Sequence, residues 1–209
     1  MHDGHDHDHD TTFQPDHDTG PATPYEVLET AVRELLIEKG VLTTEEIAKQ
    51  IDMTDTRSGA LGAKVVAKAW SDPAFKERFL TDCRAALAEL DIDIGEVAEF
   101  VAIENTPDVH NVVVCTLCSC YPKLLLGIPP AWYKSLAYRS RTIREPRAVL
   151  KEFGTDIADS VEVRVHDSTA DLRYIVLPAR PNGTDDWDED QLAAIVSRDC
   201  MIGTAVPKA

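Results

Sequence analysis

Three cysteines within six residues form the part of the chain best suited to chemistry. Cys115, Cys118 and Cys120 follow a Cys-x-x-Cys-x-Cys pattern, whereas Cys83 and Cys200 are distant in the sequence. An odd number of cysteines, three of them clustered, does not suggest a secreted disulfide framework. In a reducing compartment, clustered cysteines indicate metal or redox chemistry.

The spacing favours a metal site with an open coordination position. Structural zinc normally takes four side chains in two separated pairs, and iron–sulfur clusters also want four ligands. Because Cys-x-Cys brings the backbone close to a bound metal, the amide nitrogens of Ser119 and Cys120 are candidate ligands. Three sulfurs and two nitrogens leave one position open, as in catalytic metal sites. Two alternatives are three ordinary buried thiols, or a redox pair in which Cys118 resolves Cys115.

The segment from Val114 to Pro122 resembles the metal-binding signature of nitrile hydratase α subunits and thiocyanate hydrolase γ subunits. Thr116 is the residue found in the cobalt branch of this family. Further matches lie on both sides, at residues 104–107, 129–135, 138–141, 145–147, 173–178, 180–184 and 198–203. The resemblance is strong over about 100–206 and weaker over 24–90.

This resemblance implies a cobalt nitrile hydratase α-type subunit, a lyase that adds water to a carbon–nitrogen triple bond. It implies one low-spin cobalt(III) per chain, with sulfur ligands from Cys115, Cys118 and Cys120 and backbone nitrogen ligands from Ser119 and Cys120. In the family the second cysteine of the pattern is a sulfinate and the third a sulfenate, which correspond to Cys118 and Cys120. The Cys120 oxygen is then a candidate nucleophile or base, and Ser119 a candidate for positioning water or substrate.

The same resemblance implies partners. We expect a β-type subunit whose arginines bind the oxidised sulfurs, a small nitrile or thiocyanate as substrate, and a metallochaperone or activator. No organic cofactor is expected.

The residue after Cys-Tyr-Pro departs from most nitrile hydratases, which have a tryptophan where this chain has Lys123. A lysine beside the site would attract an anion such as thiocyanate. The alternative reading is therefore a thiocyanate hydrolase γ-like subunit, although Lys123 could equally face solvent or a subunit interface. His166 before Asp167 also replaces the usual tryptophan. A non-catalytic cobalt-binding protein is the third hypothesis.

The first 23 residues are rich in histidine and aspartate and are expected to be a disordered tail. Five of the seven histidines lie in residues 1–20, together with six aspartates. The tail is either simply solvated or a loose metal-gathering arm, because imidazole and carboxylate suit divalent cobalt, nickel or zinc.

Hydrophobic periodicity divides the rest of the chain into two parts. Residues 24–90 read as a helical arm or layer, with apolar residues at four-residue spacing, a capping box at Thr43 and Glu46, and a linker at 52–60. Residues 91–209 read as the α+β catalytic domain. The overall expectation is an N-terminal helical arm followed by a layered α-β-β-α metal-binding domain. The expected strands are 97–103, 110–114, 161–165 and 173–177, and the expected helices are 24–36, 61–70, 73–90, 131–138, 146–153 and 188–196.

Bulk properties exclude several classes of function. A net charge of -16 without a basic aromatic patch argues against nucleic-acid binding. No apolar stretch approaches the roughly 18 residues of a membrane span, and no signal peptide is evident, so a cytoplasmic protein is expected.

Four other residues, one histidine and three arginines, also invite a functional reading. We interpret His110 as a buried core or hinge histidine instead of a ligand. Arg139, Arg141 and Arg173 are candidates for contacts around the metal or across a subunit interface, with structural salt bridges as the alternative.

Overall fold

The computed structural model describes residues 24–48, 58–95, 98–118 and 120–209. The His/Asp-rich segment 1–23 and most of the predicted linker lie outside these residues. The first helix, α1 (Pro24–Glu38), confirms the four-residue spacing of its apolar side chains, and Gly40 follows it with a φ of +65°. Thr43 and Glu46 then exchange hydrogen bonds of 2.8 Å and 3.1 Å, which caps a short helix at 44–48.

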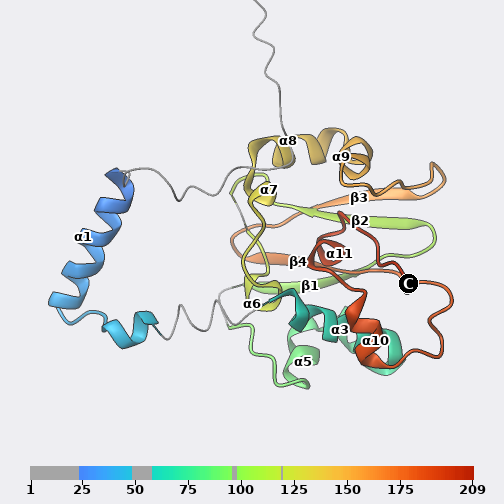
Figure 1. The fold of residues 1–209 in the computed structure, drawn as a ribbon, viewed down its shortest axis with the longest axis horizontal. Coiled ribbons are helices and arrows are strands. Elements are labelled where there is room, and N and C mark those ends of the chain that lie inside the picture. Colours follow the sequence, from blue (N-terminus) through green and yellow to red (C-terminus); the bar gives the residue numbers. More distant parts are fainter. Residues whose placement is uncertain (1–23, 49–57, 96–97, 119) are drawn as a thin grey trace, which may run out of the picture.

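Helix α1 exposes several apolar side chains to solvent. Tyr25 is 83% exposed and Val27 is 59% exposed, and Leu28, Val32 and Leu35 of α1 are also exposed. Figure 1 shows α1 apart from the layered body. An amphipathic helix whose apolar side is open to solvent is a candidate contact surface for another chain.

Three helices, α3 (Gly59–Ser71), α4 (Pro73–Thr81) and α5 (Cys83–Ala88), follow in quick succession. The prediction of one helix from residue 73 to about 90 was wrong, because the helix is interrupted at Asp82. The Asp82 carboxylate accepts a hydrogen bond from the N–H of Ala85 at 3.0 Å and so begins a new helix. Asp72 begins α4 in the same way through the N–H of Phe75.

The described strands form two parallel pairs. β1 (Glu99–Glu104) pairs with β4 (Leu172–Leu177), and β2 (Val109–Val114) pairs with β3 (Glu162–Asp167). All four strands were predicted to within a few residues. Their alternating or continuous apolar residues fit strands that are covered on one or both faces.

Helices enclose the two strand pairs, which confirms the layered α+β architecture (Figure 1). On one side α8 (Leu136–Arg144) contacts β2 and α9 (Pro146–Glu152) contacts β3. On the other, α4 and α5 pack against β1, and α10 (Glu189–Ala194) packs against α3. The predicted helix 131–138 is split, because Ser135 ends α7 (Ala131–Lys134) and caps α8. Two short helices, α6 (Lys123–Leu126) and α11 (Arg198–Ile202), complete the fold.

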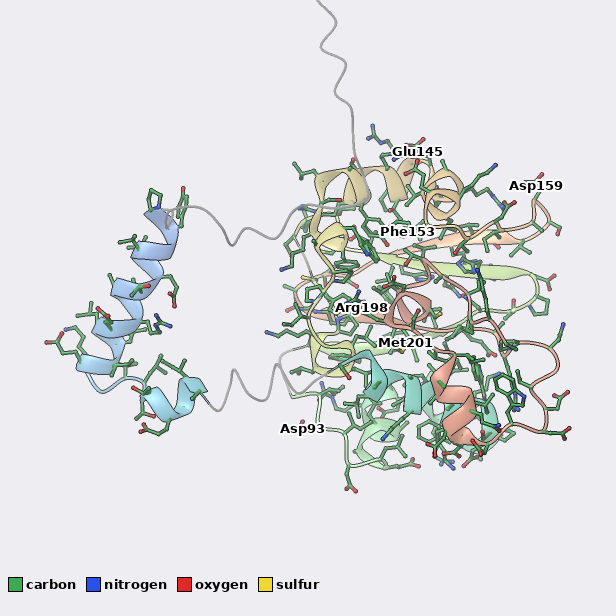
Figure 2. All side chains as sticks on the ribbon, in the orientation of Figure 1. Asp93, Glu145, Phe153, Asp159, Arg198 and Met201 are labelled. Carbon is green, nitrogen blue, oxygen red and sulfur yellow. The ribbon has the colours of Figure 1, made fainter. Side chains whose placement is uncertain are left out.

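One hydrophobic core joins the helices of 59–88 to the strands. Phe75, Phe79 and Leu87 are buried with Ile175 and Met201 in a single cluster. Figure 2 shows Met201 inside the body, whereas Asp159 and Glu145 lie at its edge. The segment 59–88 therefore packs as a layer of the body, and a domain boundary at residue 90 stays a prediction. No helix among the described residues is both long and apolar enough to span a membrane.

Candidate metal centre

The three cysteines meet directly after β2. Their sulfur atoms all lie within 4.8 Å of one another. The Sγ of Cys118 is 3.4 Å from that of Cys115 and 3.0 Å from that of Cys120. Three side chains predicted as ligands are thus brought together, whereas Ser119, predicted as a ligand through its backbone nitrogen, lies outside the described residues.

Two of the three cysteines are buried, and the third is exposed to solvent. Cys115 is fully buried and Cys120 is 9% exposed, but Cys118 is exposed. The neighbouring Leu117 is 82% exposed. A small molecule or a second chain can therefore approach the sulfurs from the side of Leu117 and Cys118.

Thr116 is held at all of its polar atoms. Its N–H donates to Oδ1 of Asp167 at 2.9 Å, and its hydroxyl donates to Oδ2 at 2.6 Å. Its carbonyl accepts a bond of 2.8 Å from Nη2 of Arg139. Because Asp167 pairs with Val114 in the parallel register, the end of β3 lies beside the start of the cysteine loop. Strand pairing and α8 together fix the first turn of the loop.

Two tyrosines fix the other end of the loop and the strand that leads into it. The hydroxyl of Tyr133 donates to the carbonyl of Cys120 at 2.9 Å, and that of Tyr138 donates to the carbonyl of Val113 at 2.7 Å. Both rings pack edge-on or tilted against each other and against Trp132. This rigid aromatic support limits how far the sulfurs can move apart.

Burial disfavours a free thiolate at Cys120. Burial raises the pKa of this thiol to about 12, and the hydrogen bond to Cys118 and the neighbouring Cys115 act in the same direction. The Arg173 guanidinium opposes these effects by lowering the same pKa. Burial also raises the pKa of Tyr121 and of Tyr133 above the ordinary tyrosine value, so both hydroxyls stay neutral. A metal that binds the sulfurs must therefore displace protons.

The donor set fits a thiophilic transition metal. No histidine or carboxylate in the described part of the chain joins the three sulfurs as a further ligand. Soft thiolate ligands select thiophilic metals over magnesium or calcium. A redox pair would need only two sulfurs, yet the third sulfur here lies as close as the other two.

The remaining candidates occupy different places. His110 is 5% exposed and hydrogen-bonds to Asn105 and Gly203, which agrees with its interpretation as a core histidine. Arg141 forms ion pairs with Glu145 and Glu152, a structural arrangement.

The two remaining candidates are Arg173, whose charge acts on Cys120, and Lys123, which lies three residues after Cys120 in the sequence. Arg173 donates to the backbone carbonyls of Thr169 and Leu172. Lys123 is exposed at the start of α6 and makes no ion pair with another described residue.

Sequence reasoning assigned no site role to two residues that contact the cysteine loop. Asp167 was noted only as the neighbour of His166, and Tyr133 only as part of a motif. Alternation along β3 predicts that Asp167 and His166 face opposite sides, but only the parallel pairing with β2 brings Asp167 to Thr116.

Comparison with known proteins identifies the relatives of the chain. Residues 23–205 match the family model described as nitrile hydratase, alpha chain. The cobalt-containing nitrile hydratase subunit alpha of Pseudonocardia thermophila is 50% identical over 181 residues, covering 86% of this chain and 89% of the relative. Thiocyanate hydrolase subunit gamma of Thiobacillus thioparus is 45% identical over 195 residues, covering 88% and 80% respectively.

Solved structures give the same picture. A recombinant thiocyanate hydrolase with partially modified cobalt centres matches with a TM-score of 0.85 and 44% identity, over 90% of this chain and 92% of that chain. A double mutant of an Fe-type nitrile hydratase from Comamonas testosteroni Ni1 matches with a TM-score of 0.83 and 44% identity, over 90% and 93%.

Proposed function

Because the chain belongs to the nitrile hydratase α-chain family, we propose that it is the cobalt-carrying catalytic subunit of an enzyme that hydrates a nitrile to an amide. The observation that carries this proposal is that three cysteine sulfurs lie within 4.8 Å of one another, directly after the C-terminal end of β2. The alpha subunits of cobalt-containing nitrile hydratases, at about half identity over most of their length, support the choice of metal and reaction. In reaction class the enzyme is a carbon–oxygen lyase.

In this proposal one cobalt(III) per chain is held by the sulfurs of Cys115, Cys118 and Cys120 and by the backbone nitrogens of Ser119 and Cys120. When bound, the metal supplies a Lewis acid that polarises the nitrile or activates water. The chain itself keeps the sulfurs in place, through Asp167 and Arg139 on Thr116 and through Tyr133 on the Cys120 carbonyl. Oxidised Cys120 provides a catalytic oxygen, and the Ser119 hydroxyl positions water or substrate.

A β-type subunit completes the enzyme in this proposal. The apolar side of α1 is open, Leu117 of the cysteine loop is 82% exposed, and Leu136 at the start of α8 is 75% exposed. An exposed apolar helix face such as that of α1 commonly marks a protein interface. A metallochaperone or activator that loads cobalt, and a cytoplasmic setting that keeps unloaded thiols reduced, belong to the same proposal.

Thiocyanate is the second candidate substrate, and Lys123 is the observation that favours it. The lysine stands three residues after Cys120 and is exposed, so its ammonium is free to meet an incoming anion. Thiocyanate hydrolase subunit gamma is among the relatives, at 45% identity. Under this alternative the same cysteine loop works on an anionic substrate.

The deciding experiment is to purify the chain with its co-expressed partners, to measure its metal content, and to assay a panel of nitriles together with thiocyanate. Stoichiometric cobalt with nitrile turnover supports the main proposal, and thiocyanate turnover above nitrile turnover supports the alternative. Cobalt binding without turnover of either substrate would favour a non-catalytic cobalt-binding protein.

A further inference from the structure

A buried network of polar side chains lies at the start of β2, away from the cysteines. It consists of Asn105, His110, Asn111 and His166, with the carbonyl of Gly203, and we call it the β2 polar network. Asn105, His110 and Asn111 are each at most 6% exposed. Among the described residues, this network links the β2–β3 pair to the end of β1 and to the C-terminal segment.

Asn111 is the centre of the β2 polar network. Its side-chain amide donates to the carbonyl of Glu104 at 2.7 Å and to Oδ1 of Asn105 at 3.0 Å. Its backbone N–H donates to the same Asn105 oxygen at 2.7 Å. Its own Oδ1 can therefore only accept, and it accepts from Nε2 of His166 at 2.9 Å.

These bonds fix the protonation of His110. Because Asn105 uses its Oδ1 to accept from Asn111, its Nδ2 must be the group 3.3 Å from Nδ1 of His110. Nδ1 therefore accepts, and Nε2 carries the hydrogen that it donates to the carbonyl of Gly203 at 2.7 Å. The network is complete only with a neutral His110 in the Nε2–H form.

We propose that His110 is a positioning residue for the proposed cobalt centre, because its neutral form fixes Asn105 and Asn111 and thereby holds β2, the strand directly before Cys115, against the end of β1. A protonated His110 would turn Nδ1 into a donor that faces the donor Nδ2 of Asn105. Turning the Asn105 amide to relieve this clash would take its oxygen away from both Asn111 donors. Acid therefore loosens the strand that carries the metal site, at a point five residues before its first ligand.

The surroundings of His110 fit this role. Burial lowers the pKa of His110 below the ordinary value of 6.5, so the neutral form prevails at neutral pH. Asp156 and Arg180 line a cavity of about 410 Å³ that reaches His110, and they carry opposite charges. The other titratable group of the network, His166, keeps its Nε2–H donor whether it is neutral or protonated. Its protonation thus leaves the bond to Asn111 intact.

The sign of the pH effect follows from the lowered pKa. Above about 6.5, the folded and unfolded chains both hold a neutral histidine, and the stabilisation is fully present. As the pH falls below about 6.5, the unfolded chain takes up a proton more readily than the folded one, so stability is lost until the folded pKa is passed. Cobalt retention should fall over the same window.

The test compares non-titrating variants in the intact complex with its partner subunit. His110→Asn keeps an acceptor near the position of Nδ1, and His110→Gln keeps a donor near the position of Nε2. We expect both variants to retain cobalt at pH 7.5. Between pH 7 and 5, their cobalt content should decline by no more than half as much as that of the wild type. Cobalt content and thermal unfolding midpoint need no substrate, so failure of the nitrile assay would count against the proposed function without touching this inference.

His166→Gln is the matched control, because it keeps the donor to Asn111 while removing a histidine. It should leave the acid decline unchanged, and a decline removed by His166→Gln but kept in both His110 variants would overturn the proposal. If the His110 variants do not fold, ¹⁵N-histidine NMR of the wild-type complex decides. An Nε2–H tautomer at pH 7.5 supports the proposal, and an Nδ1–H tautomer or an imidazolium contradicts it.

Discussion

The carboxylate of Asp167 accepts two hydrogen bonds from Thr116, one from its backbone N–H at 2.9 Å and one from its hydroxyl at 2.6 Å. The two residues are 51 positions apart in the sequence, and the parallel pairing of β2 with β3 brings them together. A carboxylate that accepts from both donors of one residue fixes the position and the rotation of that residue. Because Cys115 immediately precedes Thr116, these bonds also restrict the position of the Cys115 backbone.

Replacing Asp167 should therefore loosen the cysteine loop. Asp167→Asn removes the negative charge and presents a donor to one of the two Thr116 donors. We expect the unfolding free energy to drop by about 1 kcal/mol, since the pair is partly exposed, and cobalt to dissociate several-fold faster under a chelator. Asp159→Asn, at an exposed aspartate between α9 and β3, is the control and should change neither quantity. Equal dissociation rates of cobalt from both variants would show that the hydrogen bonds between Asp167 and Thr116 do not support the metal site.

Cys115→Ser should abolish cobalt binding and activity, because a hydroxyl is a poor ligand for a thiophilic metal at neutral pH. The measurement is metal content per chain by elemental analysis of the purified complex. Cys83→Ala removes a buried thiol in helix α5, outside the sulfur cluster, and should retain cobalt. Stoichiometric cobalt in Cys115→Ser would refute the ligand assignment, and zinc in the active wild type would count against cobalt.

Cys118 and Cys120 should be oxidised in the active enzyme. Peptide mass spectrometry without reductant is expected to show about two added oxygens on Cys118 and about one on Cys120. Cys83 provides an internal control, because it is buried in α5 and does not belong to the cluster of three sulfurs that would hold the metal. Full activity in protein whose cysteines are all unmodified would contradict this prediction.

Lys123→Trp should lower the ratio of thiocyanate to nitrile turnover. At about 4–6 Å and an effective dielectric near 20, an ammonium attracts an anion by a few kcal/mol before desolvation is subtracted. The expected net change is on the order of 1 kcal/mol, or several-fold in the ratio of kcat/KM values. Lys151→Trp, at an exposed position of α9, is the control for an added aromatic ring. An unchanged ratio with intact cobalt content would mean that Lys123 does not face the substrate.

The sequence by itself determined the candidate metal ligands and the types of most elements. The spacing of Cys115, Cys118 and Cys120 is local, so three sulfurs within six residues could be predicted to converge without knowledge of the fold. The strands followed from alternating or continuous apolar residues, and the Thr43–Glu46 cap from a four-residue pattern. Asp82 was a local signal that the sequence analysis missed, because an N-cap residue inside a helical pattern divides that pattern into two helices.

Only the tertiary structure decided what surrounds the sulfurs. Asp167 reaches Thr116, and Tyr133 reaches the Cys120 carbonyl, through strand register and helix packing. His110 likewise joins Gly203 across 93 residues. Hydrogen-bond partners distant in sequence depend on how whole layers pack, and a residue's type gives its donors and acceptors but not its neighbours. The candidate ligands could therefore be named from the sequence, whereas the groups that hold them in place required the fold.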